Sequence, residues 1–270
     1  GGLHRVAARR VLAYMNPPRW EKSNGRDVIA MLGSESSRYD IPNFLAEHIE
    51  TERRSRVGAW RGVGTSYTKF AAESFIDELA IARGIDSLEF RQNLCHNNPR
   101  ALNILATVAE MADWSRPRDN TALGLSLAGY SRTFGGGIAE VSVDRTTGII
   151  TVHNFWLAAD AGYLLQPSNS QAQLEGNVVF GISNTLKERL NIQDGVVQQS
   201  NYYDYQVMRM NEMPNIEVRA ISTNNPPTGM GEIGLGSVSG AIANAVFAAT
   251  GARVRHLPLT PERVLAAMTT

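Results

Sequence analysis

A chain of 270 residues, 43% of them hydrophobic, can form one large domain or two smaller ones; its 26 Lys and Arg balance its 26 Asp and Glu, so no basic excess points to nucleic acid. The single cysteine, Cys95, excludes an internal disulfide framework, and it excludes an iron–sulfur cluster held by this chain alone, because such clusters take about four thiolates. No apolar run approaches the roughly 20 residues that span a bilayer, and no signal peptide is visible.

Residues 1 to about 60 read as irregular. The chain opens with GGLHRVAARR, an amphipathic segment without an initial methionine, and a turn is expected at Asn16-Pro17-Pro18. Further along, Pro42 favours an extended start. A helix is equally compatible with this stretch, because five residues can line one helical face: Ile41, Phe44, Leu45, His48 and Ile49.

Three helices are expected next. Helical spacing predicts the first over 73–83, where Ile76, Leu79, Ala80 and Arg83 recur, with Gly84 at the C′ position. Asp86 or Ser87 can cap a second helix that runs through Leu94. The third is expected over 99–114, with an apolar face formed by Leu102, Leu105, Val108, Ala109 and Ala112.

After about residue 120 the pattern changes to strands. GIAEVSVD and IITVHNFWLAAD alternate apolar and polar residues on both sides of RTTG, which predicts a hairpin. SQAQLEGNVVFGISNTL (170–186) follows a helical period but contains Gly176 and Gly181. Glycine is costly inside a helix, so the pair indicates that something packs very close to this helix backbone.

The remaining segments complete an α+β pattern. A second hairpin is expected around Asp194-Gly195, NIEVRAI reads as a strand, and AIANAVFAATG reads as a small-residue helix ending at Gly251. We therefore expect a mainly helical part over 1–120 and an α+β part over 121–270, in which β-hairpins alternate with Gly/Ala-rich helices.

One carboxylate, Glu232, lies among five glycines in PPTGMGEIGLGSVSGAIANA (226–245). Gly229 to Gly234 match G-x-G-x-x-G, but STNNPPT separates the preceding strand from the first glycine, and no acid lies about 20 residues further on, so the dinucleotide-binding interpretation fails. Two alternatives remain. The segment is a turn with a solvated acid, or its glycines admit a cofactor close to the backbone and Glu232 is a poorly solvated general base.

Four segments resemble one known family, in the family's own order, from about residue 39 to 265. WRGVGTSYTKFAAESFIDELA resembles its R-G-x-G segment and following helix, and AADAGYLLQPSNSQAQLEGNVVFGIS its Q-x-E-G stretch. YYDYQVMRMNEMPNIEV and GMGEIGLGSVSGAIANAVFAATGARVRHLPLTPERV resemble its last two motifs. The family is the molybdenum hydroxylases of the xanthine dehydrogenase and aldehyde oxidase type, and the resemblance is to the C-terminal part of their molybdopterin-binding large subunit, in the isoquinoline 1-oxidoreductase β-subunit and bacterial aldehyde dehydrogenase branch.

The resemblance implies a role for individual residues. Glu232 matches the active-site glutamate that deprotonates a Mo–OH group, whose oxygen attacks an electron-poor carbon while hydride passes to a sulfido ligand. Arg61, Gly62 and Val63 match the loop beside the substrate pocket. The cofactor-binding positions implied are Gln173, Gly229, Gly231, Gly234, Gly236, Ser237 and Ser239, with the glycines and serines of 233–241 matching a loop around the pterin. The resemblance assigns no metal ligand to the protein, because molybdenum is held by the pterin dithiolene, and the five histidines show no ligand spacing.

The chain departs from the family pattern at two points. Purine-oxidising relatives place an aromatic residue where Val63 stands, so substrate size stays open. The half of the large subunit with the G-Q-G loop is also absent, so we expect a split or processed subunit whose pocket is completed by a partner chain. The resemblance further implies a pterin with a cytosine dinucleotide tail, a partner subunit with [2Fe–2S] clusters, and an acceptor such as a cytochrome c; the compartment, periplasmic or cytoplasmic, stays open.

These expectations combine into a hydroxylase that acts on an aldehyde or an N-heteroaromatic carbon with water-derived oxygen and is active only in complex with its partner chains. The alternative is a non-catalytic assembly subunit that retains the fold. Retention of both Glu232 and Gln173 argues against that alternative, because packing alone does not need this acid.

Overall fold

The computed structural model describes residues 33–34, 38–47, 49, 58, 60–130 and 132–269. The expected helical start, the turn at 16–18 and His48 lie outside these residues. The described helices are α3 (Thr65–Ala82), α4 (Ser87–Asn93), α5 (Pro99–Ala112), α6 (Pro167–Leu186), α7 (Leu235–Thr250), α8 (Pro261–Met268) and the short 3-10 helix η1 (Met210–Glu212). The strands are β1 (Ala122–Tyr130), β2 (Thr133–Val143), β3 (Ile150–Asp160), β4 (Ile192–Gln193), β5 (Val196–Val197) and β6 (Asn215–Ile221).

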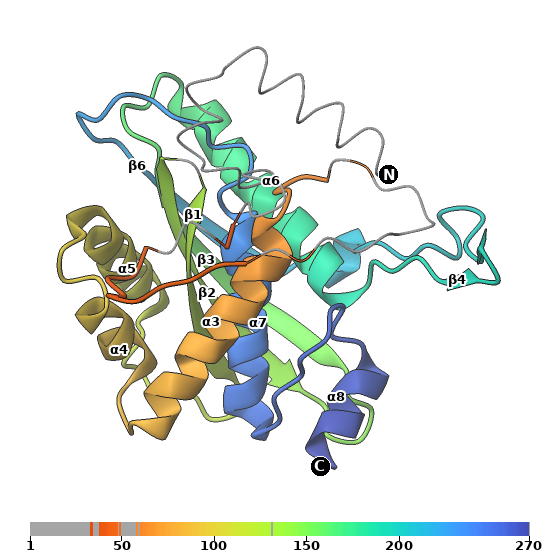
Figure 1. Cartoon of the computed structure of the whole chain (residues 1–270). Helices are drawn as coiled ribbons and strands as arrows, with labels where there is room; N and C mark the ends of the chain where they lie inside the picture. The colour runs from red at the N-terminus through yellow and green to blue at the C-terminus, as the bar shows by residue number, and fades with distance from the viewer. Residues whose placement is uncertain are drawn as a thin grey trace.

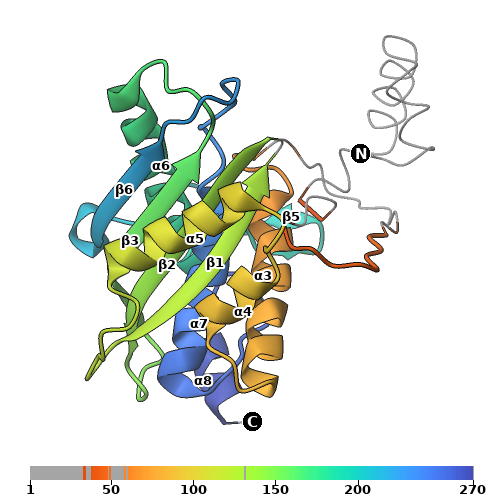
Figure 2. The ribbon, with the colours of Figure 1, turned by 90° about the vertical axis from the view of Figure 1, so that its left-hand side faces the viewer.

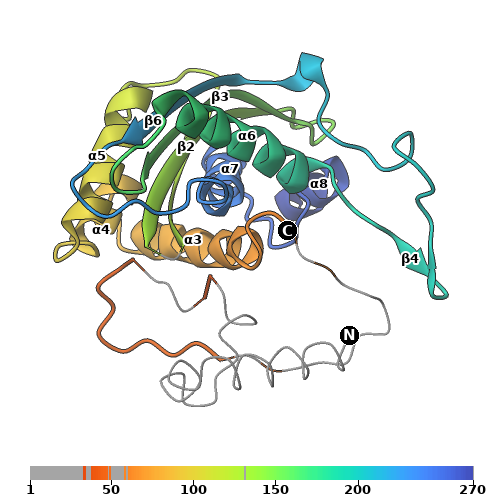
Figure 3. The same cartoon turned by 90° about the horizontal axis from the view of Figure 1, so that it is seen from above.

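A four-stranded sheet in the order β1-β2-β3-β6 forms the middle of the molecule (Figure 1). β1, β2 and β3 are antiparallel neighbours, whereas β6 runs parallel to β3. α5 crosses one face of the sheet (Figure 2), and α7 packs with α3 and α6 on the other, as the view from above shows (Figure 3). The fold is therefore a three-layer α+β arrangement, which confirms the predicted class.

Alternating residues of the strands supply both faces of the sheet. On β3, Trp156 and Ala158 belong to the core under α5, while Phe155 and Leu157 belong to the core under α6 and α7. β1 was missed by sequence reasoning because its buried positions are glycine, alanine and serine as well as leucine. A strand covered on both faces shows no alternation of apolar with polar residues.

Most predicted elements are confirmed, with shifted boundaries. The hairpin of β2 and β3 forms, as does the small hairpin of β4 and β5, where Asp194 and Gly195 have φ of 51° and 80°. Asp86 caps α4 by accepting from two backbone N–H groups, and Gly84 follows α3 with φ 64°. α6 and β6 also form, and α7 is followed by Gly251.

Two expectations were wrong, and one open alternative is decided. α3 begins at Thr65 rather than at residue 73. Its first turns bury Thr65, Lys69 and Phe70, and because two of these residues are polar, apolar spacing does not reveal this part of the helix. The buried face of α5 includes Ala101 and Ile104, whereas Leu102 and Ala109 are only half-buried. The described residues of 41–49 are not helical, in agreement with the extended alternative.

A buried ion-pair network joins α3, α4 and β1. Arg91 is fully buried, and its Nε lies 3.0 Å from Oε2 of Glu73, which is 1% exposed. The same carboxylate accepts from the backbone N–H of Leu127 at 2.9 Å and from the hydroxyl of Tyr39 at 2.8 Å. Because buried charges are costly without partners, this network constrains how α3 packs against the sheet. The turn before α3 is held in place as a result.

Candidate functional site

The R-G-V-G segment forms a tight turn immediately before α3. Gly62 has φ 85° and Val63 has φ 48°, a conformation that a β-branched residue rarely adopts. The backbone N–H of Val63 donates to the carbonyl of Trp60, and that of Thr65 donates to the carbonyl of Gly62. Strain of this kind costs about 1–3 kcal/mol and is concentrated at functional sites. The turn exposes the backbone N–H of Gly62 towards the glycine-rich segment.

Arg61 connects this turn to two other segments of the chain. Its Nε donates to the carbonyl of Gly231 at 2.7 Å, and its Nη1 donates to the carbonyl of Gly176 at 3.0 Å. Its Nη2 donates to Oε1 of Gln173 at 3.1 Å. Partial burial lowers the pKa of the guanidinium, and the negative charge of Glu232 opposes that shift. One arginine thus positions three of the predicted site segments relative to one another.

Glu232 lies at the centre of this arrangement. Its Oε1 accepts a hydrogen bond of 2.9 Å from the backbone N–H of Gly62. The side chain is half-buried between the turn at Gly62 and the start of α7. A carboxylate that is oriented by a backbone donor and still reachable from solvent can accept a proton from a bound group.

Tyr130 was missed by sequence reasoning. It ends β1, and its pKa is raised by burial, by the negative charge of Glu232 and by a hydrogen bond with that carboxylate. The sequence offers only a tyrosine at the end of a strand that was itself missed. Its hydroxyl places a second polar group beside Glu232.

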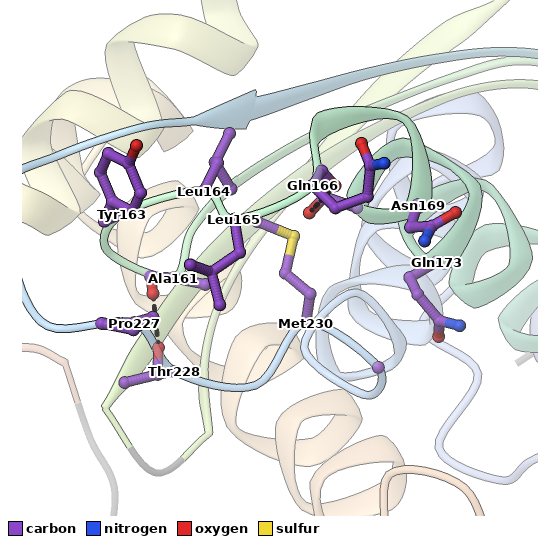
Figure 4. A pocket seen from close by; sticks show the side chains of 12 residues that line it. Ala161, Tyr163, Leu164, Leu165, Gln166, Asn169, Gln173, Pro227, Thr228 and Met230 are labelled. Carbon is purple, nitrogen blue, oxygen red and sulfur yellow. Dashed lines mark hydrogen bonds between the residues drawn. The ribbon is translucent and has the colours of Figure 1, made fainter.

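An open cleft of about 250 Å³ lies between α6 and the 227–231 segment. Gln166, Asn169 and Gln173 lie along the α6 side of this cleft, and Met230 lies on the segment that crosses it (Figure 4). Oε1 of Gln173 is held by Arg61, whereas its Nε2 makes no hydrogen bond with any residue that the structure describes. The cleft therefore presents several amide groups and is bordered by Gly231, the residue before Glu232.

The predicted glycines fall into two groups. A Cβ on Gly229 would meet nothing within 4 Å, and one on Gly231 would lie 3.5 Å from Gln173, so both border open space. A Cβ on Gly234 would lie 2.7 Å from Asn177, and one on Gly236 would lie 3.1 Å from Ala128. Packing within the chain already explains these last two glycines, whereas no tight packing contact explains the first two.

The expected loop over 233–241 is wrong from Leu235 onward, because α7 begins there. Ser237 and Ser239 therefore lie in the first turns of a helix, where both are buried. The Ser237 hydroxyl donates to the carbonyl of Gly234, and the Ser239 hydroxyl donates to the carbonyl of Ser66. Contact of either serine with a cofactor stays a prediction.

The residues around the cleft fit a pterin. Such a ring system needs donors and acceptors at close range, and the amide side chains of α6 and the open backbone at Gly229 and Gly231 offer both. Among the described residues, no three His, Cys, Asp or Glu side chains are arranged to hold a metal ion. None of the described helices is long and apolar enough to cross a bilayer.

Comparison with known proteins gives matches along most of the chain. Residues 100–214 match the family model described as molybdopterin cofactor-binding domain. The beta subunit of isoquinoline 1-oxidoreductase from Brevundimonas diminuta is 34% identical over 96% of this chain and 33% of its own length. One nicotinate dehydrogenase subunit from Pseudomonas putida is 36% identical over 91% of this chain and 24% of its own length. The chain thus spans a third or less of the length of these two relatives.

A solved structure shares the fold. The crystal structure of quinoline 2-oxidoreductase from Pseudomonas putida 86 superposes with a TM-score of 0.70, covering 79% of this chain and 53% of that one. The sequence identity in this match is 16%, so it supports the arrangement of helices and strands and nothing finer.

Proposed function

The chain belongs to the molybdopterin cofactor-binding domain family of molybdenum hydroxylase large subunits, and on that premise we propose that it forms part of an oxidoreductase that hydroxylates an N-heteroaromatic or aldehyde carbon. Two relatives, named for isoquinoline and nicotinate, support the N-heteroaromatic class first. The observation that carries the proposal is a set of hydrogen bonds between segments far apart in the chain: Arg61 donates to Gln173 and Gly231, which line the cleft, and Gly62 donates to Glu232.

The cofactor would be held by backbone and amide groups. Gln173 would contact it through the amide nitrogen that Arg61 leaves available, and the chain at Gly229 and Gly231 would approach it closely. When bound, the cofactor supplies the two-electron oxidation and delivers oxygen derived from water. We further propose a cytosine dinucleotide tail and transfer of electrons to [2Fe–2S] clusters of a partner subunit.

Glu232 is proposed as the general base. The Gly62 N–H fixes the direction of one carboxylate oxygen, and the half-buried side chain would then take a proton from a group bound beside it. Tyr130 lies against the same carboxylate and limits how it can rotate. A base of this kind contributes about 10²–10⁴-fold to the rate, which is why its orientation matters.

The turn at Arg61 and Val63 is proposed to border the substrate. Val63 presents an aliphatic side chain and no ring on which a substrate could stack. Orientation of the substrate would then depend on polar groups and on the partner chain that completes the pocket. The chain spans 33% of the length of its isoquinoline 1-oxidoreductase relative, and we propose that the part of such a large subunit that this chain does not cover completes the pocket.

The test is to purify the native complex through this chain, identify every co-purifying subunit and measure molybdenum, iron and released cytidine monophosphate. Near-stoichiometric molybdenum and iron with a second large chain would support the proposal, and a screen of N-heteroaromatic compounds followed by aldehydes would then identify the substrate. A folded chain that carries neither metal nor partner would contradict the catalytic proposal and favour the assembly role.

A further inference from the structure

A second cavity, of about 230 Å³, lies next to the cleft along residues 225–228. It is lined by three arginines, Arg38, Arg100 and Arg132, together with Phe134, Asn225, Pro226 and Thr228. Thr228 also lines the cleft that contains Gln173, so the two cavities share a wall. None of the functions discussed above uses these arginines.

Two of the arginines are ordered by one aromatic ring. The guanidinium carbon of Arg38 lies 4.3 Å from the centroid of Phe134, and that of Arg100 lies 4.4 Å from the same centroid. Stacking on an aromatic face is favourable for guanidinium groups and holds their planes in place. The ring itself is buried, with 8% exposure. Stacking therefore holds both guanidinium groups in place before any ligand arrives. Arg100 already donates to Asp160 and to the carbonyl of Arg132, and Nη2 of Arg38 donates to the carbonyl of Thr133, so these two arginines contribute mainly their charge and their remaining N–H groups.

The chain also makes room for Arg38. A Cβ built on Gly129 would lie 1.9 Å from Nε of Arg38 and 2.8 Å from its Cδ. Any side chain at position 129 would push the guanidinium away from the cavity. Position 129 must therefore be glycine to leave space for Arg38, which lines this cavity and not the cleft.

The positive charges are close to one another. Burial lowers the pKa of Arg38, and the positive charge of Arg100 lowers it further. Arg100 is paired with Asp160 through contacts of 2.6 and 2.8 Å. The guanidinium of the exposed Arg132 makes no hydrogen bond or ion pair with any residue that the structure describes, so its donors can serve a ligand. An anion in the cavity would relieve the mutual repulsion of these cations.

We propose that this arginine pocket binds a phosphate group. Planar guanidinium groups recognise phosphate with paired N–H donors, and the oxygens of a phosphate can accept from several arginines at once, whereas a carboxylate has only two. The phosphate can belong to the tail of a cofactor that extends from the cleft past Thr228, or to a free phosphate compound. The pocket does not depend on the general-base role of Glu232.

Inorganic pyrophosphate is the probe, and isothermal titration of the complex purified through this chain is the measurement. We expect wild type to bind pyrophosphate more tightly than acetate at matched ionic strength. We expect Arg132→Gln to weaken pyrophosphate binding at least tenfold. Gly129→Ala should weaken it too, by displacing Arg38 without removing charge. The matched control is Arg116→Gln, because Arg116 is exposed and does not line the pocket; it should bind like wild type.

Comparison of cofactor-free and cofactor-loaded complex identifies the source of the phosphate. If loading blocks pyrophosphate binding and Arg132→Gln lowers the cofactor retained after gel filtration, the cofactor tail occupies the pocket. If both forms bind pyrophosphate equally, a free phosphate compound is the ligand. The inference is overturned if wild type does not prefer pyrophosphate to acetate in either form, or if folded Arg132→Gln binds as wild type does. Pyrophosphate binding by a complex without molybdenum would leave this inference standing while the proposed function fails.

Discussion

The backbone N–H of Gly62 donates a hydrogen bond of 2.9 Å to Oε1 of Glu232, although 170 positions separate the two residues. The donor stands in a turn whose conformation is fixed by a glycine and a strained valine, and the acceptor stands just before α7. Preorganised donors of this kind need no rearrangement when a reaction begins. The position of the carboxylate therefore depends on how the turn is anchored.

Arg61 is the anchor of that turn, and Arg61→Lys is expected to reduce turnover by about 10- to 100-fold, because small misplacements of catalytic groups have effects of this size. Lysine keeps the charge but cannot donate from a planar fork to Gly231, Gly176 and Gln173 together. Steady-state kinetics of the purified complex measure the effect. Arg83→Lys, on the exposed end of α3, is the control. Equal turnover in both variants would show that the anchor is unimportant.

Replacement of the two glycines of α6 by alanine is expected to change the free energy of unfolding in different ways. A Cβ on Gly181 would lie 2.7 Å from Cβ of Val238, so Gly181→Ala is expected to lower the free energy of unfolding by about 1–3 kcal/mol through overpacking. A Cβ on Gly176 would approach only the end of the flexible Arg61 side chain, at 3.5 Å. Gly176→Ala is expected to be neutral or to stabilise by up to about 1 kcal/mol through helix propensity. Urea denaturation distinguishes the two, and equal effects would contradict the packing argument.

The buried carboxylate of Glu73 predicts a large loss of stability. Glu73→Gln leaves Arg91 without a main counter-charge in the interior, so we expect the free energy of unfolding to fall by about 3–5 kcal/mol. The control is Glu110→Gln, which removes an exposed ion pair with Arg219 and should cost less than about 1 kcal/mol. Chemical denaturation of both variants at neutral pH is the measurement. Similar losses of unfolding free energy in the two variants would mean that the buried ion pair contributes no more to stability than the exposed one.

The hydrogen bonds of Asp160 are expected to make part of the stability of the fold sensitive to acid. Burial alone would raise its pKa, but hydrogen bonds from Arg100, Gly162 and Thr223 outweigh burial and lower the pKa below its ordinary value of 3.8. Because the folded state holds the carboxylate ionised to lower pH than the unfolded state does, this stabilisation is present above about pH 4 and is lost as the pH falls through the folded-state value. Asp160→Asn should therefore be less stable at pH 7 and lose less stability between pH 4 and pH 2. Parallel losses in both proteins would contradict this.

The sequence predicted those elements of the fold in which apolar and polar residues recur with the period of a strand or a helix. Alternation predicted β2 and β3. The two glycines of α6 predicted close packing, which the contact with Val238 confirms at Gly181, whereas Gly176 has only an ordinary contact with Arg61. The division into parts at residue 120 stays a prediction. β1 was missed because both of its faces are buried, so small and apolar residues follow each other without a period.

Sequence reasoning predicted which residues belong to the candidate site but not how they are arranged. The family resemblance singled out Arg61, Gln173 and Glu232, which the structure brings together, and their roles stay predictions. It did not reveal which atoms meet, because contacts between distant segments leave no local pattern. Tyr130 was missed for the same reason, whereas the helical position of Ser237 was missed because the glycines in its neighbourhood disfavour a helix locally.

The most direct test of the account compares turnover of wild type and Glu232→Gln in complexes with equal molybdenum content. Glutamine keeps the size of the side chain and an oxygen that can accept from Gly62, but it cannot take up a proton as a carboxylate does. The account predicts intact assembly and a loss of turnover of about 10²–10⁴-fold, the contribution of a general base. Turnover within about tenfold of wild type would contradict the role of Glu232.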